Sequence, residues 1–259
     1  MFQLRHHNRS ARPEETDIVL GRCQMDYAIT STETNDMLTL LFDIDGTLVR
    51  AGGAGLMAMK QAMEELHGID QLPDVTVHGR TDHSIVSDIF APLPVEVDQA
   101  RDAFTNRYCE LLPQTLPKCD GHVLPNVVEL LEHLSGREDV SLGLLTGNMK
   151  RASDAKMNYF KLNHHFAYGG FGDAHPHRND VARIAKEAAA NHLGDRFIEG
   201  NVWVIGDTVN DITCGRSIGA KVVAVETGGG SRAELVASDP DLIYQTLPDP
   251  RSFLEHLRG

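Results

Sequence analysis

The chain has 259 residues, 41% of them hydrophobic, which is enough to bury a large core as one big domain or as a domain with an insertion. Its 37 acidic and 24 basic residues give a formal net charge of −13, and such a charge repels nucleic acid and anionic membrane surfaces. No apolar run is long enough to cross a bilayer, and the first residues lack the apolar block of a secretory signal. We therefore expect a globular cytoplasmic protein that binds neither nucleic acid nor membranes.

Residues 1–36 are polar and show no sustained hydrophobic periodicity, so we expect a flexible N-terminal extension. Apolar runs then begin at four places along the chain: LTLLFDI at Leu38, VSLGLLTG at Val140, VWVIGD at Val202 and KVVAVET at Lys221. Strands that are apolar on both faces indicate a buried parallel sheet. Helical patterns at 126–134 and 180–193 lie between these runs. The alternation predicts an α/β fold with a Rossmann-like core, in which helices flank a parallel sheet.

Residues 52–121 break this alternation, because they carry helical patterns and no comparable apolar run. The apolar positions of a first helix are expected on one face: Leu56, Met59, Met63 and Leu66. A second helix is expected over residues 98–112. The pattern predicts a helical insertion at 52–121 within a core made of residues 37–51 and 122–259.

Polar residues follow the predicted strands at the point where each strand ends. They are Asp43 and Asp45 after the first strand, Thr146, Gly147 and Asn148 after the second, and Asp207 and Asp211 after the third. A basic candidate, Arg178, lies between the last two of these strand ends. Because the carboxyl ends of parallel strands share one edge of the sheet, we expect all these groups to converge there.

With these motifs, the stretch from Leu38 to the C-terminus resembles the haloacid dehalogenase-like phosphohydrolases. That family carries a DxDGT loop, a Ser or Thr after the second core strand, a Lys or Arg, and a GDxxxD loop. The matching residues here are DIDGT from Asp43, Thr146, Arg178 and GDTVND from Gly206. The resemblance implies a Rossmann-like hydrolase core, and it implies that the insertion is the small α-helical cap of the phosphoglycolate phosphatase-like branch.

The first motif supplies two carboxylates for a reaction at phosphorus. Hydrolysis of a phosphomonoester through a covalent step needs a carboxylate nucleophile and an acid that protonates the departing oxygen. We assign these roles to Asp43 and Asp45, because the turn at Gly46 allows both to reach the same phosphorus atom. The alternative is a simple turn, since Asp and Gly are common turn formers. The matching GDxxxD loop favours catalysis.

The acidic residues after the third strand are candidates for a magnesium site. Asp207 and Asp211 lie four residues apart, and together with Asp43 they offer the oxygen ligands that Mg²⁺ prefers. Capping of the following helix is the alternative role, and it suits Asp211 better than Asp207. The family resemblance adds the backbone carbonyl of Asp45 as a further metal ligand.

Donors for the phosphoryl oxygens are expected from the turn after the second strand. The Thr146 hydroxyl and the amides of Gly147 and Asn148 can hold these oxygens by hydrogen bonds. The phosphoryl-binding cation is assigned to Arg178, although the family usually places a lysine followed by proline there. Lys150 and Lys156 are therefore retained as alternatives.

A polar stretch in the insertion, HGRTD at residues 78–82, is similar to the loop that such caps lower over the active site. Its Arg80 is a candidate to bind a second anionic group of the substrate. Arg50, just after the first motif, is another. A surface arginine in a loop is the ordinary alternative for Arg80.

We predict a Mg²⁺-dependent phosphatase that hydrolyses small phosphorylated metabolites, such as phosphoglycolate or a sugar phosphate, through an aspartyl-phosphate on Asp43. A phosphosugar mutase shares all the motifs and is an open alternative, as is a non-catalytic phosphate-binding regulatory module. Dehalogenation at carbon needs neither a metal nor an aspartate two residues after the nucleophile, so Asp45 and Asp207 argue against it.

Overall fold

The computed structural model describes residues 37–93 and 97–259, so the predicted N-terminal extension, residues 1–36, lies outside the described part of the chain. Within that part, six parallel strands form one sheet in the order β5-β4-β1-β6-β7-β8. The strands are β1 (Leu38–Phe42), β4 (Val140–Leu145), β5 (Tyr168–Gly170), β6 (Val202–Gly206), β7 (Lys221–Val225) and β8 (Leu242–Tyr244). The four predicted strands are confirmed as β1, β4, β6 and β7.

Helices pack on both faces of this sheet. They are α4 (Val127–Ser135), α5 (Lys150–Tyr159), α6 (Arg178–Leu193), α7 (Val209–Ser217), α8 (Arg232–Ala237) and α9 (Pro250–Arg258), with short 3₁₀ turns η2 (Asn163–His165), η3 (Gly194–Arg196) and η4 (Glu199–Asn201). Leu40 and Phe42 of β1 join the apolar cluster of α4 and α9, whereas Leu41 joins that of α6 and α7. Burial on both faces explains why the central strands are apolar throughout. The α/β, Rossmann-like fold is therefore confirmed.

The two edge strands, β5 and β8, are missing from the sequence prediction because each has only three residues. In β5, a Cβ at Gly170 would lie 2.4 Å from the carbonyl oxygen of Val181 in α6. Glycine at this position lets α6 pack directly on the strand. The same glycine removes the apolar signal by which a strand is predicted.

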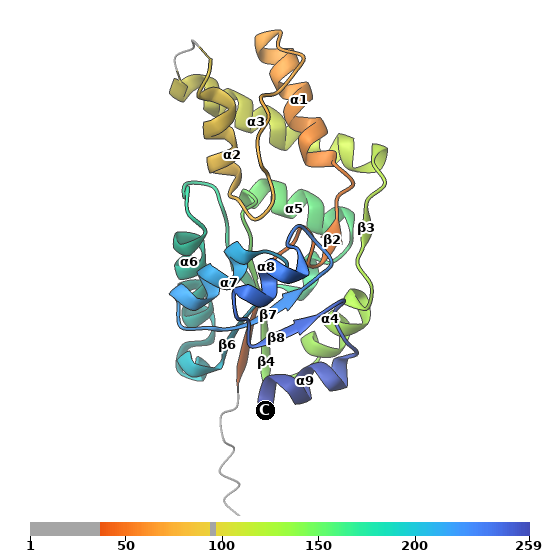
Figure 1. Ribbon diagram of the computed structural model, residues 1–259, viewed down its shortest axis with the longest axis vertical. Helices are drawn as coiled ribbons and strands as arrows, with labels where there is room; N and C mark the ends of the chain where they lie inside the picture. The colour runs from red at the N-terminus through yellow and green to blue at the C-terminus, as the bar shows by residue number, and fades with distance from the viewer. Residues whose placement is uncertain (1–36, 94–96) are drawn as a thin grey trace, which may run out of the picture. The chain divides into compact units, whose positions relative to one another are not determined.

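A short antiparallel pair flanks the insertion, with β2 (Val49–Arg50) before it and β3 (His122–Val123) after it. Between the two strands lie α1 (Ala54–His67), α2 (Asp82–Phe90), α3 (Val97–Thr115) and the 3₁₀ turn η1 (Leu116–Lys118) (Figure 1). The two predicted helices are present as α1 and α3, and α2 is an addition. The assignment of residues 52–121 as a cap domain remains a prediction. In the part of the chain that is described, no helix has the length and apolar content to cross a bilayer.

The buried face of α1 differs from the predicted one. Leu56 and Leu66 are 50% and 41% exposed. The residues that pack in the cluster with α2 and α3 are Ala54, Ala58, Met59, Ala62 and Met63. Small alanine side chains let α1 pack closely against α3, so the apolar stripe is rotated away from the two leucines. Leu56 is consequently available to line a cavity.

Candidate active site

The end of β1 places two carboxylates at the carboxyl edge of the sheet. The amide of Asp43 donates to the carbonyl oxygen of Ile205 at 2.9 Å, and the residue is 6% exposed. Gly46 adopts a positive φ of 89°, and its amide donates to the carbonyl oxygen of Val49 at 2.8 Å. This tight turn, which favours glycine, brings Asp45 to the same cavity as Asp43.

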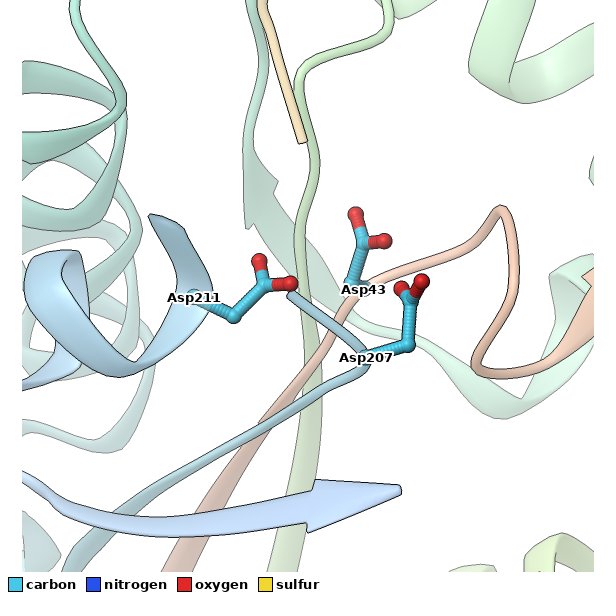
Figure 2. A group of neighbouring side chains, drawn as sticks. All are labelled: Asp43, Asp207 and Asp211. Carbon is cyan, nitrogen blue, oxygen red and sulfur yellow. The ribbon is translucent and has the colours of Figure 1, made fainter. Parts of the chain in front are cut away.

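Three buried carboxylates gather at this edge (Figure 2). Asp207 directly follows β6, and Asp211 lies in the first turn of α7. One carboxylate oxygen from each of Asp43, Asp207 and Asp211 lies within 4.8 Å of the other two. Asp211 also forms a capping box with Thr208, so its two predicted roles are compatible.

Burial and mutual repulsion raise the pKa values in this cluster. The pKa of Asp43 rises to about 7, mainly through burial; Arg178 opposes the rise, while Asp211 and Asp45 add to it. The pKa of Asp207 rises to about 8 through burial, followed by repulsion from Asp211 and Asp43. A divalent cation among these oxygens would relieve both effects. The cluster therefore has the electrostatics of a cation site.

Glycines enclose Asp207. The amide of Gly229 donates to Asp207 Oδ2 at 2.6 Å, and the Thr47 hydroxyl donates to Oδ1 at 3.3 Å. A Cβ would lie 1.8 Å from Asp207 Oδ2 at Gly228, and 2.5 Å from it at Gly46. Motif reasoning missed Gly228 and Gly229, although the run of three glycines after β7 is a visible signal for close backbone approach.

The turn after β4 presents Thr146, Gly147 and Asn148 to the same cavity. The Asn148 side-chain amide donates to Thr146 Oγ1 at 2.8 Å and to Asp45 Oδ2 at 2.7 Å. A Cβ at Gly147 would lie 1.9 Å from the carbonyl oxygen of Arg80, so only glycine fits beneath the 78–82 loop. Binding of phosphoryl oxygens by this turn remains a prediction.

Arg178, the first residue of α6, is buried at 8% exposure. Its Nη2 donates to Asp43 Oδ1 at 3.1 Å and to the carbonyl oxygen of Leu145 at 3.4 Å, and it also pairs with Asp211. Its Nε has no hydrogen-bond partner among the residues described. The predicted cation therefore contacts the predicted nucleophile.

Lys156 of α5 is a second buried cation, at 5% exposure. Its Nζ donates to Asp45 Oδ2 at 2.5 Å and to Asn148 Oδ1 at 2.7 Å. Lys150 is half-exposed and pairs with Asp154 one turn along α5. Two of the three candidate cations thus contact the predicted catalytic carboxylates, and Lys150 does not.

Both predicted substrate-binding arginines line the cavity, but each already has a partner. Arg80 Nη1 donates to Asp88 Oδ2 at 2.6 Å and to the carbonyl oxygen of Thr76 at 3.3 Å. Arg50 donates to the carbonyl oxygen of Thr227 from Nε at 3.2 Å and from Nη2 at 2.7 Å. Their binding of a second anionic group remains a prediction.

Asp82, the first residue of α2, is a buried carboxylate that the motifs did not reveal. Its side chain accepts a hydrogen bond from the Met149 amide at 2.8 Å, and its own amide donates to the Gly147 carbonyl at 2.7 Å. Burial raises its pKa to about 6. An aspartate at a helix start ordinarily indicates only favourable helix electrostatics, so the sequence carries no separate signal for this role.

Most of these groups line one cavity of about 640 Å³, whereas Asp211 and Lys150 lie outside its lining. One side, here called the core side, consists of residues at the strand ends and the helices that follow them: Asp43, Asp45, Thr146, Lys156, Arg178 and Asp207. The other, here called the cap side, consists of residues from the insertion: Leu56, Met59, Val77, Ile85 and Tyr108. The core side offers carboxylates and cations, and the cap side offers an apolar wall next to the polar side chains of His78, Arg80, Asp82 and Asp120.

Two curated proteins that are named as phosphatases are similar to this chain in sequence. The chain is 25% identical over 224 residues to the probable phosphatase IndB of Dickeya dadantii, covering 81% of this chain and 90% of that protein. It is 26% identical over 215 residues to a phosphoglycolate phosphatase of Synechococcus elongatus, covering 82% of this chain and 95% of that protein.

The fold has solved relatives as well. The crystal structure of CbbY from Rhodobacter sphaeroides, in complex with phosphate, matches with a TM-score of 0.66 at 18% identity, covering 86% of this chain and 100% of that chain. The family model for haloacid dehalogenase-like hydrolases matches residues 40–225, which include both the DxDGT and the GDxxxD motifs. This chain therefore belongs to the haloacid dehalogenase-like hydrolase family.

Proposed function

We propose that this protein is a Mg²⁺-dependent phosphatase that hydrolyses small phosphomonoesters through a covalent intermediate on Asp43. The observation that carries the proposal is the buried cluster of Asp43, Asp207 and Asp211, whose carboxylate oxygens lie within 4.8 Å of one another. The contact of Arg178 with Asp43 supports it, because a cation beside the nucleophile is also beside the phosphorus that it attacks. The two curated relatives named as phosphatases support the reaction type.

The residues present fit Mg²⁺. Their donors are carboxylate oxygens and they are buried, and the pKa values of Asp43 and Asp207 are raised by that burial and then by repulsion among the carboxylates. Asp43, Asp207 and Asp211 would hold the ion, together with the backbone carbonyl of Asp45 that the family resemblance implies. When bound, the ion supplies positive charge that keeps Asp43 ionised and offsets the charge of the phosphoryl oxygens.

The chain's own residues then divide the reaction between them. A carboxylate oxygen of Asp43 attacks phosphorus, the bond to the leaving oxygen breaks, and Asp45 gives that oxygen a proton. Asp45 next takes a proton from water, the water oxygen attacks phosphorus, and inorganic phosphate leaves as Asp43 is regenerated. Thr146 and Arg178 hold the phosphoryl oxygens throughout. Lys156 anchors Asp45 Oδ2, which leaves Oδ1 for the proton transfers.

The test is release of inorganic phosphate from p-nitrophenyl phosphate and from a panel of small phosphorylated metabolites, with Mg²⁺ and with EDTA. We expect release only with Mg²⁺. Asp43→Asn is nearly isosteric, so we expect an intact fold and a loss of turnover of at least about 1,000-fold. The matched control is Asp154→Asn, which changes a partly exposed carboxylate on α5 and should leave turnover unchanged.

Other outcomes separate the alternatives. If Asp43→Asn keeps a tenth of the turnover, Asp43 is not the nucleophile. If substrate is consumed without stoichiometric phosphate release, the protein transfers phosphoryl groups and is a mutase. If phosphate binds but no substrate is consumed under any condition, the protein is a binding module.

A further inference from the structure

We infer that the substrate's leaving group is uncharged and bears hydroxyl groups, and that the Tyr108 hydroxyl binds it. The inference rests on the proposed phosphatase function and narrows its substrate class. It favours phosphates of sugars and other polyols over phosphoglycolate and other phosphorylated carboxylates.

The cavity has room for a leaving group of several carbons and an apolar wall beside it. Its volume of about 640 Å³ lies within the range of sites that enclose a whole small ligand. On the cap side, Leu56, Met59, Val77 and Ile85 present only hydrocarbon to that space. Such a wall accepts a carbon skeleton, whereas a carboxylate placed against it would lose hydration without compensation.

The lysine and arginine side chains around the cavity already have hydrogen-bond partners. Among the described residues, each lysine or arginine that lines it donates to an acceptor: Arg50 to Thr227, Arg80 to Asp88, Lys156 to Asp45, and Arg178 to Asp43. In the proposed reaction, Arg178 binds the phosphoryl oxygens and is not available to the leaving group. The charges of Arg80 and Lys156 are offset by the carboxylates of Asp88 and Asp45, whereas Arg50 donates to a neutral carbonyl. A second anionic group on the substrate would therefore compete with an aspartate at Arg80 or Lys156, and Arg50 is the remaining cation it could approach.

Acidic side chains in the cavity also disfavour a substrate with a second anionic group. Asp82 and Asp120 also line the cavity, away from the metal-binding cluster. Asp82 is 6% exposed, and its pKa of about 6 leaves it ionised at pH 8. A carboxylate on the leaving group would be repelled most strongly by Asp82, which is buried, and less by Asp120, which is exposed. A hydroxyl group can instead donate to them.

Tyr108 adds an uncharged hydroxyl to the cap side, whose other polar side chains are His78, Arg80, Asp82 and Asp120. The residue is 1% exposed and lines the cavity, and its hydroxyl has no hydrogen-bond partner among the described residues. A Cβ at Gly55 would lie 3.7 Å from this hydroxyl, which places it beside the start of α1, another part of the lining. Burial, and then the carboxylates of Asp82 and Asp45, raise the pKa of Tyr108 well above its ordinary value, so the phenol keeps its proton. It is thus a buried donor that faces the substrate space.

The first arm of the test compares substrates that differ only in charge. Glycerol 3-phosphate and 3-phosphoglycerate differ by a hydroxymethyl group in place of a carboxylate, and 2-hydroxyethyl phosphate and phosphoglycolate form a second such pair. The assay is run with Mg²⁺ at pH 8, where histidine side chains are ordinarily neutral. We expect kcat/KM to be at least about tenfold higher for the uncharged member of each pair. Equal or higher kcat/KM for the carboxylates overturns the inference.

The second arm of the test removes the hydroxyl group of Tyr108. Tyr108→Phe should lower kcat/KM for glycerol 3-phosphate by about three- to tenfold, the effect of one lost hydrogen bond. Phenyl phosphate, whose leaving group carries no further hydroxyl, should change less than about twofold with the same variant. Tyr159→Phe is the matched control, because Tyr159 is 41% exposed on α5 and does not line the cavity. An equal loss on both substrates would overturn the role of the hydroxyl.

Failure of the inference is distinguishable from failure of the proposed function. If no phosphate ester is hydrolysed with Mg²⁺, the phosphatase function itself is wrong. If esters are hydrolysed but the charged members are preferred, the function stands and the substrate class proposed here is wrong.

Discussion

The core side and the cap side of the cavity use their polar groups differently. On the core side, polar groups are bonded to one another, as Asp45 is to Lys156 and Asp207 is to the Gly229 amide. On the cap side, an apolar wall lies beside the polar side chains of His78, Arg80, Asp82, Tyr108 and Asp120, and the Tyr108 hydroxyl has no partner within residues 37–93 and 97–259.

Because of this difference, we expect substitutions on the two sides of the cavity to have different effects on activity. A substitution on the core side leaves a buried charge or amide without its partner, which is costly. A substitution on the cap side that preserves packing should act mainly on what the cavity accepts. We therefore expect reaction chemistry and substrate choice to depend on different parts of the chain.

The largest effect is expected from Asp45→Asn on the core side. Loss of a general acid and base should lower turnover of an alkyl phosphate by about 100- to 10,000-fold. Phosphoenzyme formation from p-nitrophenyl phosphate should fall much less, because its leaving group needs little protonation. Rapid-quench measurement of both substrates checks this, and equal losses would contradict the acid role.

Gly228→Ala should have the next largest effect, because the new Cβ would lie 1.8 Å from Asp207 Oδ2. We expect a destabilisation of about 1–3 kcal/mol from this overpacking, and turnover at least about tenfold lower as Asp207 is displaced. The matched control is Gly200→Ala, since no atom lies within 4 Å of a Cβ there. Thermal unfolding and phosphate release are measured on both variants; comparable behaviour would show that Asp207 does not need its glycine enclosure.

A smaller effect is expected on thermal stability as a function of pH. In the metal-free protein, the pKa values of Asp43 and Asp207 rise from the ordinary 3.8 to about 7 and about 8. Between about pH 4 and about pH 8, these two carboxyl groups bind fewer protons in the unfolded chain than in the native protein. The free energy of unfolding therefore decreases as the pH rises through this range.

If Mg²⁺ binds the native cluster, as proposed, it should raise the Tm, with a larger rise at pH 8 than at pH 5.5, because at the lower pH protons compete for the same oxygens. Thermal unfolding with EDTA or Mg²⁺ at both pH values tests this. Asp207→Asn should reduce both the pH dependence and the Mg²⁺ response, whereas Asp154→Asn should preserve them. A Mg²⁺ response independent of pH would argue against the cluster as the binding site.

The smallest effect is expected from Arg80→Ala. Its ion pair with Asp88 is partly exposed, with side chains 26% and 52% accessible, so the loss of stability should be below about 1 kcal/mol. If Arg80 stays paired during turnover, the ranking of uncharged over carboxylate substrates should not change. A selective loss of activity on phosphorylated carboxylates would instead support the anion-binding role predicted from the sequence.

The sequence was most informative where motif and strand coincide. Asp43, Thr146 and Asp207 each follow an apolar run, and parallel pairing then requires that they share one edge. Tyr108 and Asp82 could not be found this way, because each looks like an ordinary helix residue and its role depends on contacts distant in the chain. The rotated face of α1 has a similar cause, since alanines that pack closely on α3 carry a weak hydrophobic signal.

The two hydrogen bonds of Asp82 have a consequence for the release of product. They join the start of α2 to Gly147 and Met149, which lie on either side of Asn148 in the turn after β4. Any outward motion of the 78–82 loop has to break them, so the turn loses part of its restraint at the moment the cavity opens to solvent. If the turn holds phosphate, as proposed, loosening of that hold and opening of the cavity would occur in the same motion.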